Sequence, residues 1–373
     1  MPPPEPPEYD STGVEYHEIA DFRFTSGTTL HDVKVAYRSY NSGSSQGTVL
    51  IPTCFSGLIN GTLTFNKDPL SSLSGYHVVV VAMLSNGESS SPSNKKFFPA
   101  PGELRYEDQI HAQYDLLTKG LNVKELEAVI GFSMGGQQAY HWAVMYPDYV
   151  KRAVCICTSA RTSPHNYAFL EGPIAAMTSS IDYVAWKQVK AKIAHGEDVG
   201  TNLKEVRPKR GIAAWARAYA AWLTSAQWFR DREWSKASNL GPACSSVEEW
   251  MQVRESNYGK WDADDLLTKA RQWQMADIGQ THKGEVTEMS CQVRNLDDDA
   301  YVNALKSIKA KVLVMPCRTD QYFPPEDSEI EVKHLQDGTL AVIESTWGHT
   351  AGGGANPADA KWMDEKIAEH VKR

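Results

Sequence analysis

The chain has 373 residues, of which 42% are hydrophobic, and it includes 11 tryptophans and 16 tyrosines. A chain of this length and composition can bury a sizeable core and suits one core domain with a large insertion. Its formal net charge of -8 at pH 7 argues against nucleic acid and membranes as partners, because an acidic surface repels other anions. No stretch approaches the roughly 20 apolar residues of a membrane span, and the N-terminus differs from a cleavable targeting peptide, so we expect a cytoplasmic protein.

The first residues are rich in proline and acidic side chains, which predicts a disordered tail over 1–12. Six cysteines are scattered along the chain, a pattern that favours free thiols over a disulfide framework. Cys155 and Cys157 have the spacing of two metal ligands, but no second Cys or His pair completes a tetrahedral set. We therefore expect neither a metal nor a cofactor.

Apolar strands alternate with polar turns in the first part of the chain. Two alternating runs, 22–27 and 33–40, are separated by polar turn residues and predict an antiparallel pair. Continuous apolar runs at 47–53 and 77–84 predict strands that are buried on both faces. The polar loop at 85–96 follows the second of these strands, where loops often face a substrate.

Helices and strands then alternate. Helical spacing over 105–119 is followed by a strand pattern over 121–133, a helix that ends before Pro147, and a strand pattern over 150–160. This order predicts a doubly wound, mostly parallel α/β sheet. Reactive side chains are expected at the carboxyl ends of its strands.

From 162 to 299 the strand pattern stops, and helical stretches rich in tryptophan and alanine take its place. A structureless loop of this length is improbable in a compact domain, so we predict a helical lid inserted between core segments 13–161 and 300–373. We expect most of its aromatic side chains to fill the lid's own core or a dimer contact, and about a quarter to line a substrate pocket. These residues are Trp186, Trp215, Tyr219, Trp222, Trp228, Trp234, Trp250, Trp261 and Trp273.

The α/β pattern returns near the C-terminus. An apolar run at 311–316 predicts a strand, and Asp320 lies on the loop after it. A second run, at 340–346, predicts the last strand and leads into His349. A helical pattern over 358–371 closes the chain.

The stretch from Glu127 to His141 predicts a nucleophile elbow, a sharp strand-to-helix turn that exposes a serine at the top of a sheet. Ser133 is the serine of that turn. Gly131 and Gly135 flank it because a β-carbon at either position would crowd the neighbouring backbone.

Ser133, Asp320 and His349 occur in the order that the α/β-hydrolase fold requires, each on a loop after a core strand. Each also has an ordinary alternative: a chance G-x-S-x-G, an aspartate in a turn or cap, or a surface or core histidine. Their order and strand context together favour a catalytic triad over chance. Asp327 is a rival for the acid but lies further from the strand end.

In such a triad, His349 takes the proton of Ser133 as the serine attacks an acyl carbonyl, while Asp320 fixes the imidazole tautomer. The backbone N–H of Met134 and one from Cys54 or Phe55 would stabilise the charge that builds on the carbonyl oxygen. The product is an acyl-serine, which either water or another hydroxyl resolves.

Five segments have a more specific pattern than the triad alone. They are GFSMGGQQAYHWAVMYPDYV, FFPA with RYEDQIHAQYDLL, KWDADDLLTKARQWQMADIG, RTDQYFPPED and WGHTAGGGANP. With them the chain resembles the homoserine O-acetyltransferase family from about Gly47 to the C-terminus. The resemblance implies an α/β-hydrolase core with a helical lid, an acyl-enzyme mechanism, a homodimer built through the lids, and Phe55 as the second oxyanion donor.

The chain departs from that family at two places. The family carries an aspartate after the catalytic histidine, associated with the substrate's amino group, and this chain has Thr350. A His-Ala-Leu-Thr-Gly type loop is replaced here by residues 53–57, TCFSG. A neutral hydroxyl cannot offer a charged partner to an ammonium group, which argues against homoserine as acceptor and for the divergent branch described as α/β-fold hydrolases.

Three hypotheses follow, all with a small-molecule ligand. The first is an acyl-serine hydrolase acting on an ester or related acyl compound. The second is an O-acyltransferase with acetyl-CoA as co-substrate and a hydroxylated metabolite as acceptor, and the third is a non-catalytic binding protein on the same fold. The sequence names no substrate-binding residue: four arginines, Arg105, Arg210, Arg217 and Arg254, could each bind a carboxylate, but surface ion pairing is the commoner role.

Overall fold

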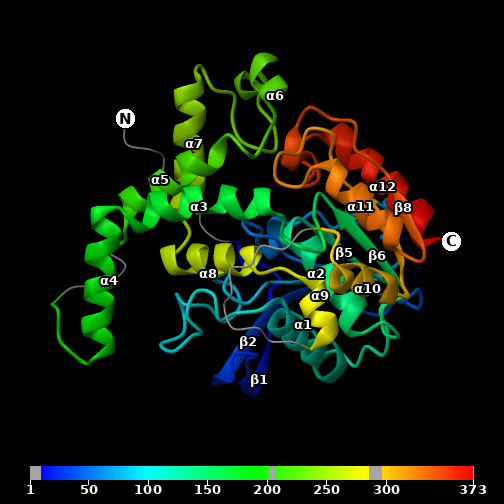
Figure 1. Ribbon diagram of the computed structural model, residues 1–373, viewed down its shortest axis with the longest axis horizontal. Coiled ribbons are helices and arrows are strands. Elements are labelled where there is room, and N and C mark those ends of the chain that lie inside the picture. The colour runs from blue at the N-terminus through cyan, green and yellow to red at the C-terminus, as the bar shows by residue number, and fades with distance from the viewer. Residues whose placement is uncertain (1–9, 201–205, 285–295, 373) are drawn as a thin grey trace.

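Figure 1 shows the computed structural model, which describes residues 10–200, 206–284 and 296–372. Its described strands form one eight-stranded sheet in the order β1-β2-β4-β3-β5-β6-β7-β8. Strand β2 pairs antiparallel with β1 and β4, and the other pairings are parallel. The strands are β1 (Glu15–Arg23), β2 (Thr29–Tyr40), β3 (Thr48–Pro52), β4 (His77–Val81), β5 (Ala128–Phe132), β6 (Arg152–Ile156), β7 (Lys311–Met315) and β8 (Gly338–Leu340). This confirms the predicted mostly parallel α/β sheet.

Each face of the sheet carries its own hydrophobic cluster. On β4, Val79 and Val81 face one cluster, while Val78 and Val80 face the other. Successive side chains of a strand point to opposite faces, so a strand covered on both sides is apolar throughout. The helices on the first face are α1 (Tyr106–Asp115), α2 (Met134–Met145), α10 (Asp299–Ser307) and α11 (Pro325–His334), and α12 (Pro357–Val371) covers the second.

The outer strands differ from their predicted bounds. Strand β1 begins at Glu15, earlier than the predicted run at 22–27, and it is mostly exposed, so its polar first half lacks the apolar signal of a buried strand. Strand β8 ends at Leu340, where the predicted run at 340–346 begins. Beyond it, the N–H groups of Ala341 and Ile343 each donate one hydrogen bond toward the β7 side, which does not make a full ladder.

Between β6 and β7 the described residues form helices and no strand of the sheet. Besides α10, these helices are α3 (Pro164–Thr178), α4 (Ile181–Ala194), α5 (Lys209–Ala220), α6 (Ala226–Arg230), α7 (Val247–Gly259), α8 (Ala263–Gln274) and α9 (Ile278–Lys283). In Figure 1, α3 to α8 lie to one side of the sheet, and α4 projects furthest from it. Helix α9 returns to the core, where Ile278 joins the cluster of α2 and α10. We use the word lid for α3 to α8 and their connections.

Capping side chains start most of the lid helices. Ser163, Ser180, Ser225 and Ser246 each accept a hydrogen bond from a backbone N–H in the first turn of α3, α4, α6 and α7. Asp262 does the same for α8. Such side chains satisfy backbone N–H groups that have no partner within the helix. The local sequence therefore sets where these helices begin.

One hydrophobic cluster joins the lid to the core. It contains Trp215 of α5 and Trp273 of α8, both fully buried, together with the core residues Met134 and Tyr322. Aromatic rings bury large areas, so this cluster supplies much of the packing that holds the lid against the sheet's carboxyl edge. The lid is thus packed against Met134 at the start of α2.

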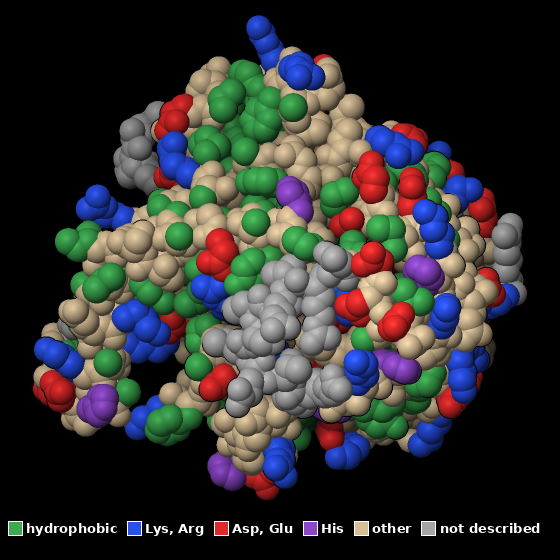
Figure 2. All heavy atoms as spheres, viewed as in Figure 1, with side chains coloured by type: hydrophobic (Ala, Val, Ile, Leu, Met, Phe, Trp, Pro, Cys, Tyr) green, Lys and Arg blue, Asp and Glu red, His purple; other side chains and the backbone are tan. Residues whose placement is uncertain are grey.

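Charges of both signs are interspersed over much of the face in Figure 2, and hydrophobic side chains gather where α6 and α7 lie. Among the described helices, none is both long and apolar enough to cross a membrane. Residues 1–9 of the predicted tail lie outside the described residues, as does Cys291. The carboxamide of Asn60 donates hydrogen bonds to the carbonyl oxygens of Asp10 and Thr12.

Candidate active site

Ser133 lies at a strained turn between β5 and α2. Its backbone has φ 57° and ψ -127°, a combination that a residue with a side chain rarely adopts. A β-carbon on Gly131 would lie 2.0 Å from the carbonyl oxygen of Gly135, and one on Gly135 would lie 2.6 Å from that of Pro52. Both glycines are therefore required by close backbone contacts. The structure shows the strand-to-helix turn that the sequence predicts at Ser133.

Hydrogen bonds join Ser133, His349 and Asp320. The distance from Ser133 Oγ to His349 Nε2 is 2.9 Å, and His349 Nδ1 lies 2.8 Å from Asp320 Oδ2. A carboxylate accepts the Nδ1 proton, which leaves Nε2 free to accept the serine proton. All three side chains are at most 5% exposed. The structure thus brings together three residues that are separated by up to 216 positions in the chain.

Asp320 is fixed by the backbone of its own loop. Its Oδ1 accepts hydrogen bonds from the N–H groups of Tyr322 and Phe323, at 2.8 and 3.2 Å. Its other oxygen is directed at His349. The rival acid, Asp327, lies in the first turn of α11 and makes no hydrogen bond to His349. The geometry selects Asp320 as the partner of the histidine.

A lid segment supports the histidine loop. The backbone N–H of Thr350 donates to the carbonyl of Leu223, and Gln321 Nε2 donates to that of Thr224. Gly348 has φ +59°, and a β-carbon there would lie 2.7 Å from the backbone of Thr224. No sequence pattern singled out this contact, because Leu223 and Thr224 lie on an ordinary turn after α5.

The two predicted oxyanion donors lie at the ends of neighbouring strands. Met134 is the first residue of α2, and Phe55 lies on the loop after β3. Neither backbone N–H donates a hydrogen bond within the described residues, so both are available to a ligand. The ring of Phe55 stacks on Trp215 and Tyr219 of α5, with centroids 5.9 and 5.7 Å apart. The lid therefore fixes the side chain of the loop that would hold the second donor.

A buried lysine lies behind that loop. Lys269 of α8 is fully buried, and its Nζ has no hydrogen-bond partner among the described residues. The Nζ lies 3.6 Å from the ring centroid of Trp261 and 5.2 Å from that of Phe55. Burial lowers the pKa of Lys269 to about 7, and it raises the pKa of the nearby Asp265 to about 7. The buried face of α8 also carries Asp265 and Gln272, so the sequence pattern does not single out Lys269, and sequence reasoning missed it.

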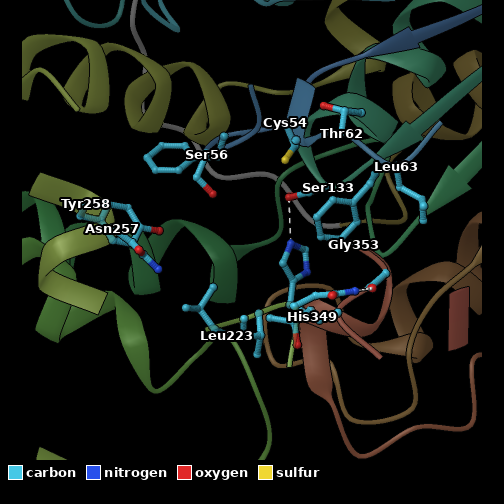
Figure 3. Close-up of a pocket in the computed structure, with 18 of the residues that line it drawn as sticks. Cys54, Ser56, Thr62, Leu63, Ser133, Leu223, Asn257, Tyr258, His349 and Gly353 are labelled. Carbon is cyan, nitrogen blue, oxygen red and sulfur yellow. Dashed lines mark hydrogen bonds between the residues drawn. The ribbon is translucent and has the colours of Figure 1, made fainter. Parts of the chain in front are cut away.

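A cavity of about 530 Å³ opens beside Ser133 and His349. Core loops form one side of it, and Asn257, Tyr258 and other residues of the lid form the opposite side (Figure 3). Cys54 also lines it, and burial raises the pKa of its thiol. Of the nine lid aromatic residues singled out in the sequence, those that line the cavity are Tyr219 and Trp261.

The four arginines that the sequence left open occupy different surroundings, and Arg210 is exposed in the first turn of α5. Arg254 lines the cavity. Arg217 pairs with Glu248 and Glu255 of α7 on the lid surface, and Arg105 contacts the sulfur of Met275. In the described part of the chain, no group of three or more His, Cys, Asp or Glu side chains is placed to hold a metal ion.

Comparison with known proteins agrees with this architecture. The family description "alpha/beta hydrolase fold" matches residues 47–177. The solved acetyl esterase MekB superimposes with a TM-score of 0.79 at 27% identity and covers 96% of this chain and 97% of its own. The chain therefore has an α/β-hydrolase fold. The family resemblance and fold class predicted from the sequence are confirmed.

The relatives to which this chain is similar fall into two functional classes. An ethyl acetate hydrolase of Pseudomonas veronii is 29% identical over 340 residues, which span 90% of this chain and 88% of the relative. A homoserine O-acetyltransferase of Trichormus variabilis is 25% identical over 358 residues, which span 90% and 88%. The comparison therefore includes both a hydrolase and an acyltransferase.

Proposed function

We propose that this α/β-hydrolase is a serine esterase that cleaves small esters through an acyl-serine intermediate. The hydrogen-bonded row of Ser133, His349 and Asp320 beside a cavity carries the proposal. The similarity to an ethyl acetate hydrolase and to an acetyl esterase supports esters of short acyl groups as substrates.

The geometry supports the following steps. Ser133 Oγ attacks the ester carbonyl as His349 Nε2 takes its proton, and the N–H groups of Met134 and Phe55 stabilise the oxyanion. The bond between the carbonyl carbon and the alcohol oxygen breaks, and the imidazolium protonates the departing alcohol. A water then attacks the acyl carbon by the same route, gives its proton to His349, and releases the acid and the free serine.

The first test is active-site labelling and turnover. A fluorophosphonate probe should label the protein, and p-nitrophenyl acetate should be hydrolysed. For Ser133→Ala, labelling should vanish and kcat should fall by about 10⁴-fold or more. Ser235→Ala, which removes an exposed hydroxyl outside the cavity, is the matched control. Equal labelling of Ser133→Ala would contradict the proposal, and an unlabelled wild-type protein would favour the binding-protein hypothesis.

Transfer to an acceptor alcohol is the second candidate function, since the chain is also similar to homoserine O-acetyltransferases. Thr350 argues against homoserine as that acceptor, because it is a neutral residue of the cavity lining where the family has a carboxylate, and its hydroxyl donates to the carbonyl of Trp347. Hydrolysis of p-nitrophenyl acetate should therefore not accelerate when homoserine is added. Faster turnover together with formation of the transferred ester would establish a transferase instead.

The homodimer through the lid is part of the same proposal. Ile181 and Val184 of α4 are 74% and 46% exposed, which is unusual for large apolar side chains on one helix and supports a contact there. Sedimentation at micromolar concentration should give twice the 41.5 kDa mass of the chain. Ile181→Lys should shift the protein to the monomer, and a wild-type monomer would contradict this assembly.

A further inference from the structure

The cavity beside Ser133 has an unusual charge. Lys67, Arg254 and Lys260 line it, and its described lining residues include no aspartate or glutamate. The chain as a whole is acidic, with 46 acidic and 38 basic residues, so the charge of this lining has the opposite sign to the net charge of the chain. A cavity with one sign of charge attracts ligands of the opposite sign.

Arg254 of α7 is the buried member of this set. It is 5% exposed, and within the described residues it forms no ion pair. One guanidinium nitrogen donates to the carbonyl of Leu240, the guanidinium carbon lies 5.4 Å from the ring centroid of Trp250, and Nε has no hydrogen-bond partner there. Glu233, across a small adjoining hollow, pairs with Lys236 instead.

Among the described residues the other buried arginine is Arg161, on the loop after β6, and it has acidic partners. Arg161 is 2% exposed and pairs with Asp277 and Asp298, at 2.9 and 2.6 Å. A buried charge without an acidic partner is costly. We therefore expect such a charge where another group, such as a bound anion, compensates it. Burial lowers the pKa of Arg254, but a guanidinium stays charged near neutral pH because its ordinary pKa lies above about 12.

Neighbouring groups in the cavity favour a small carboxylate. Asn239, Asn257 and Tyr258 line the cavity with Arg254, and their side chains carry N–H or O–H donors. The amide nitrogen of Asn239 already donates one hydrogen bond, to the carbonyl of Gly354. Lys260 is exposed at the rim, and the charge of Glu88 acts on it, so it is the weaker anchor. The guanidinium has the planar fork that matches a carboxylate.

We propose that the cavity takes a small ester that also carries a carboxylate, and that Arg254 binds the carboxylate while Ser133 attacks the ester carbonyl. This inference rests on the proposed esterase function. The substrate class is then half-esters of dicarboxylic acids or esters of hydroxy acids. The hydrolysis itself is unchanged: the ester bond breaks, water is consumed, and the free carboxylate stays bound to Arg254 until the product leaves.

Two pairs of esters of matched shape test this inference. Monoethyl succinate and ethyl pentanoate differ by a charge on the acyl side, and 3-acetoxypropanoate and butyl acetate differ on the alcohol side. In at least one pair the anionic ester should have a kcat/KM at least about tenfold higher. Equal or lower values in both pairs, with p-nitrophenyl acetate still hydrolysed through Ser133, would overturn the inference and leave the esterase proposal intact. No hydrolysis of any ester would overturn the esterase proposal itself.

Two variants test whether Arg254 causes the preference for anionic esters. Arg254→Met keeps an apolar stem over Trp250 and removes the charge, and it should reduce the anionic-to-neutral ratio of kcat/KM by about tenfold or more. Arg230→Met, which removes an exposed lid arginine outside the cavity, should leave the ratio as in the wild type. An unchanged ratio in Arg254→Met would overturn the role of this residue. Thermal unfolding of both variants checks that they fold.

Inhibition of the wild-type protein gives a second test that needs no variant. Propanoate should inhibit hydrolysis of butyl acetate competitively and at least about tenfold more strongly than propanamide, which has the same shape without the charge. Equal inhibition would count against the proposal. Desulfo-coenzyme A distinguishes a phosphate ligand: if it competes through Arg254 and the small carboxylates do not, the anion is a coenzyme phosphate and the carboxylate proposal fails.

Discussion

The core and the lid meet at Ser133, but they differ in how many of their buried polar groups have hydrogen-bond partners. In the core, Asp320 accepts three hydrogen bonds, and Glu331 accepts hydrogen bonds from Tyr140 and Tyr301. In the lid lie most of the buried polar atoms that have no partner in the described structure, among them the indole N–H groups of Trp215, Trp228 and Trp273, Nε of Arg254 and Nζ of Lys269. The core thus fixes the reacting groups before a ligand binds, whereas the lid leaves several buried donors unsatisfied, and of the residues just named Arg254 is the one that lines the cavity.

The largest expected effect separates two carboxylates of the core. Asp320→Asn should lower kcat by about 10⁴-fold. The amide oxygen would keep the hydrogen bonds from the backbone N–H groups of Tyr322 and Phe323, so the NH2 group, a donor, would face Nδ1 and favour the wrong tautomer of the histidine. Asp327→Asn is the matched control and should keep most of the activity, since Asp327 makes no hydrogen bond to His349. Burial already raises the pKa of Asp327 to about 6. The kcat of both variants is measured by steady-state kinetics on p-nitrophenyl acetate. A larger loss in Asp327→Asn than in Asp320→Asn would identify Asp327 as the acid of the triad.

The second prediction concerns rigidity at the elbow. In Gly135→Ala the new methyl would lie 2.6 Å from the carbonyl oxygen of Pro52, a backbone atom that cannot move independently. The free energy of unfolding should fall by about 3 kcal/mol, as measured by chemical denaturation. A loss below about 0.5 kcal/mol would mean that the elbow is more adaptable than this contact indicates.

The third prediction uses the buried ionisable pair of α8. Between pH 7 and 10.5 the unfolded chain binds the Lys269 proton more tightly than the folded chain, so this residue makes stability rise with pH over that window. Asp265 acts from pH 3.8 to 7, where the unfolded carboxyl ionises first, so its contribution makes stability fall as pH rises. Together they predict a minimum near pH 7 in the stability of the lid-to-core contact.

Two variants separate these contributions. Lys269→Met should remove the rise above pH 7 and increase stability at pH 7 by about 2 kcal/mol, because an apolar side chain replaces a buried charge. Asp265→Asn should remove the fall below pH 7. Thermal unfolding measured from pH 4 to 10 gives both difference curves. A Lys269→Met curve parallel to that of the wild type would show that the lysine does not titrate in this range.

The smallest effect is expected in the lid. Gly259, at the end of α7, has nothing within 4 Å of the position of a new β-carbon. Gly259→Ala should raise the free energy of unfolding by about 0.5 kcal/mol, since alanine loses less backbone entropy in a helix. Measured beside Gly135→Ala, it contrasts a lid glycine that is replaceable with a core glycine that is not. A destabilised Gly259→Ala would remove that contrast.

Some features were predictable because local sequence encodes them. The buried strands β3 to β7 are continuous apolar runs, and the serines before α3, α4, α6 and α7 mark their starts. The edge strands were harder, since β1 is exposed and β8 is only three residues long. Exposed or short strands carry little hydrophobic pattern, so their bounds follow from pairing with a neighbour.

Spacing and strand context in the sequence were enough to predict the elbow at Ser133, the order of Ser133, Asp320 and His349, and the α/β-hydrolase fold. Tertiary structure alone decided which lid residues face that serine. It selected Arg254 from four arginines, placed the Thr224 backbone against the histidine loop, and buried Lys269 behind Phe55. These contacts join segments that are far apart in the chain. The periodicity of apolar residues shows which face of a helix is buried, but it does not show which element packs against that face.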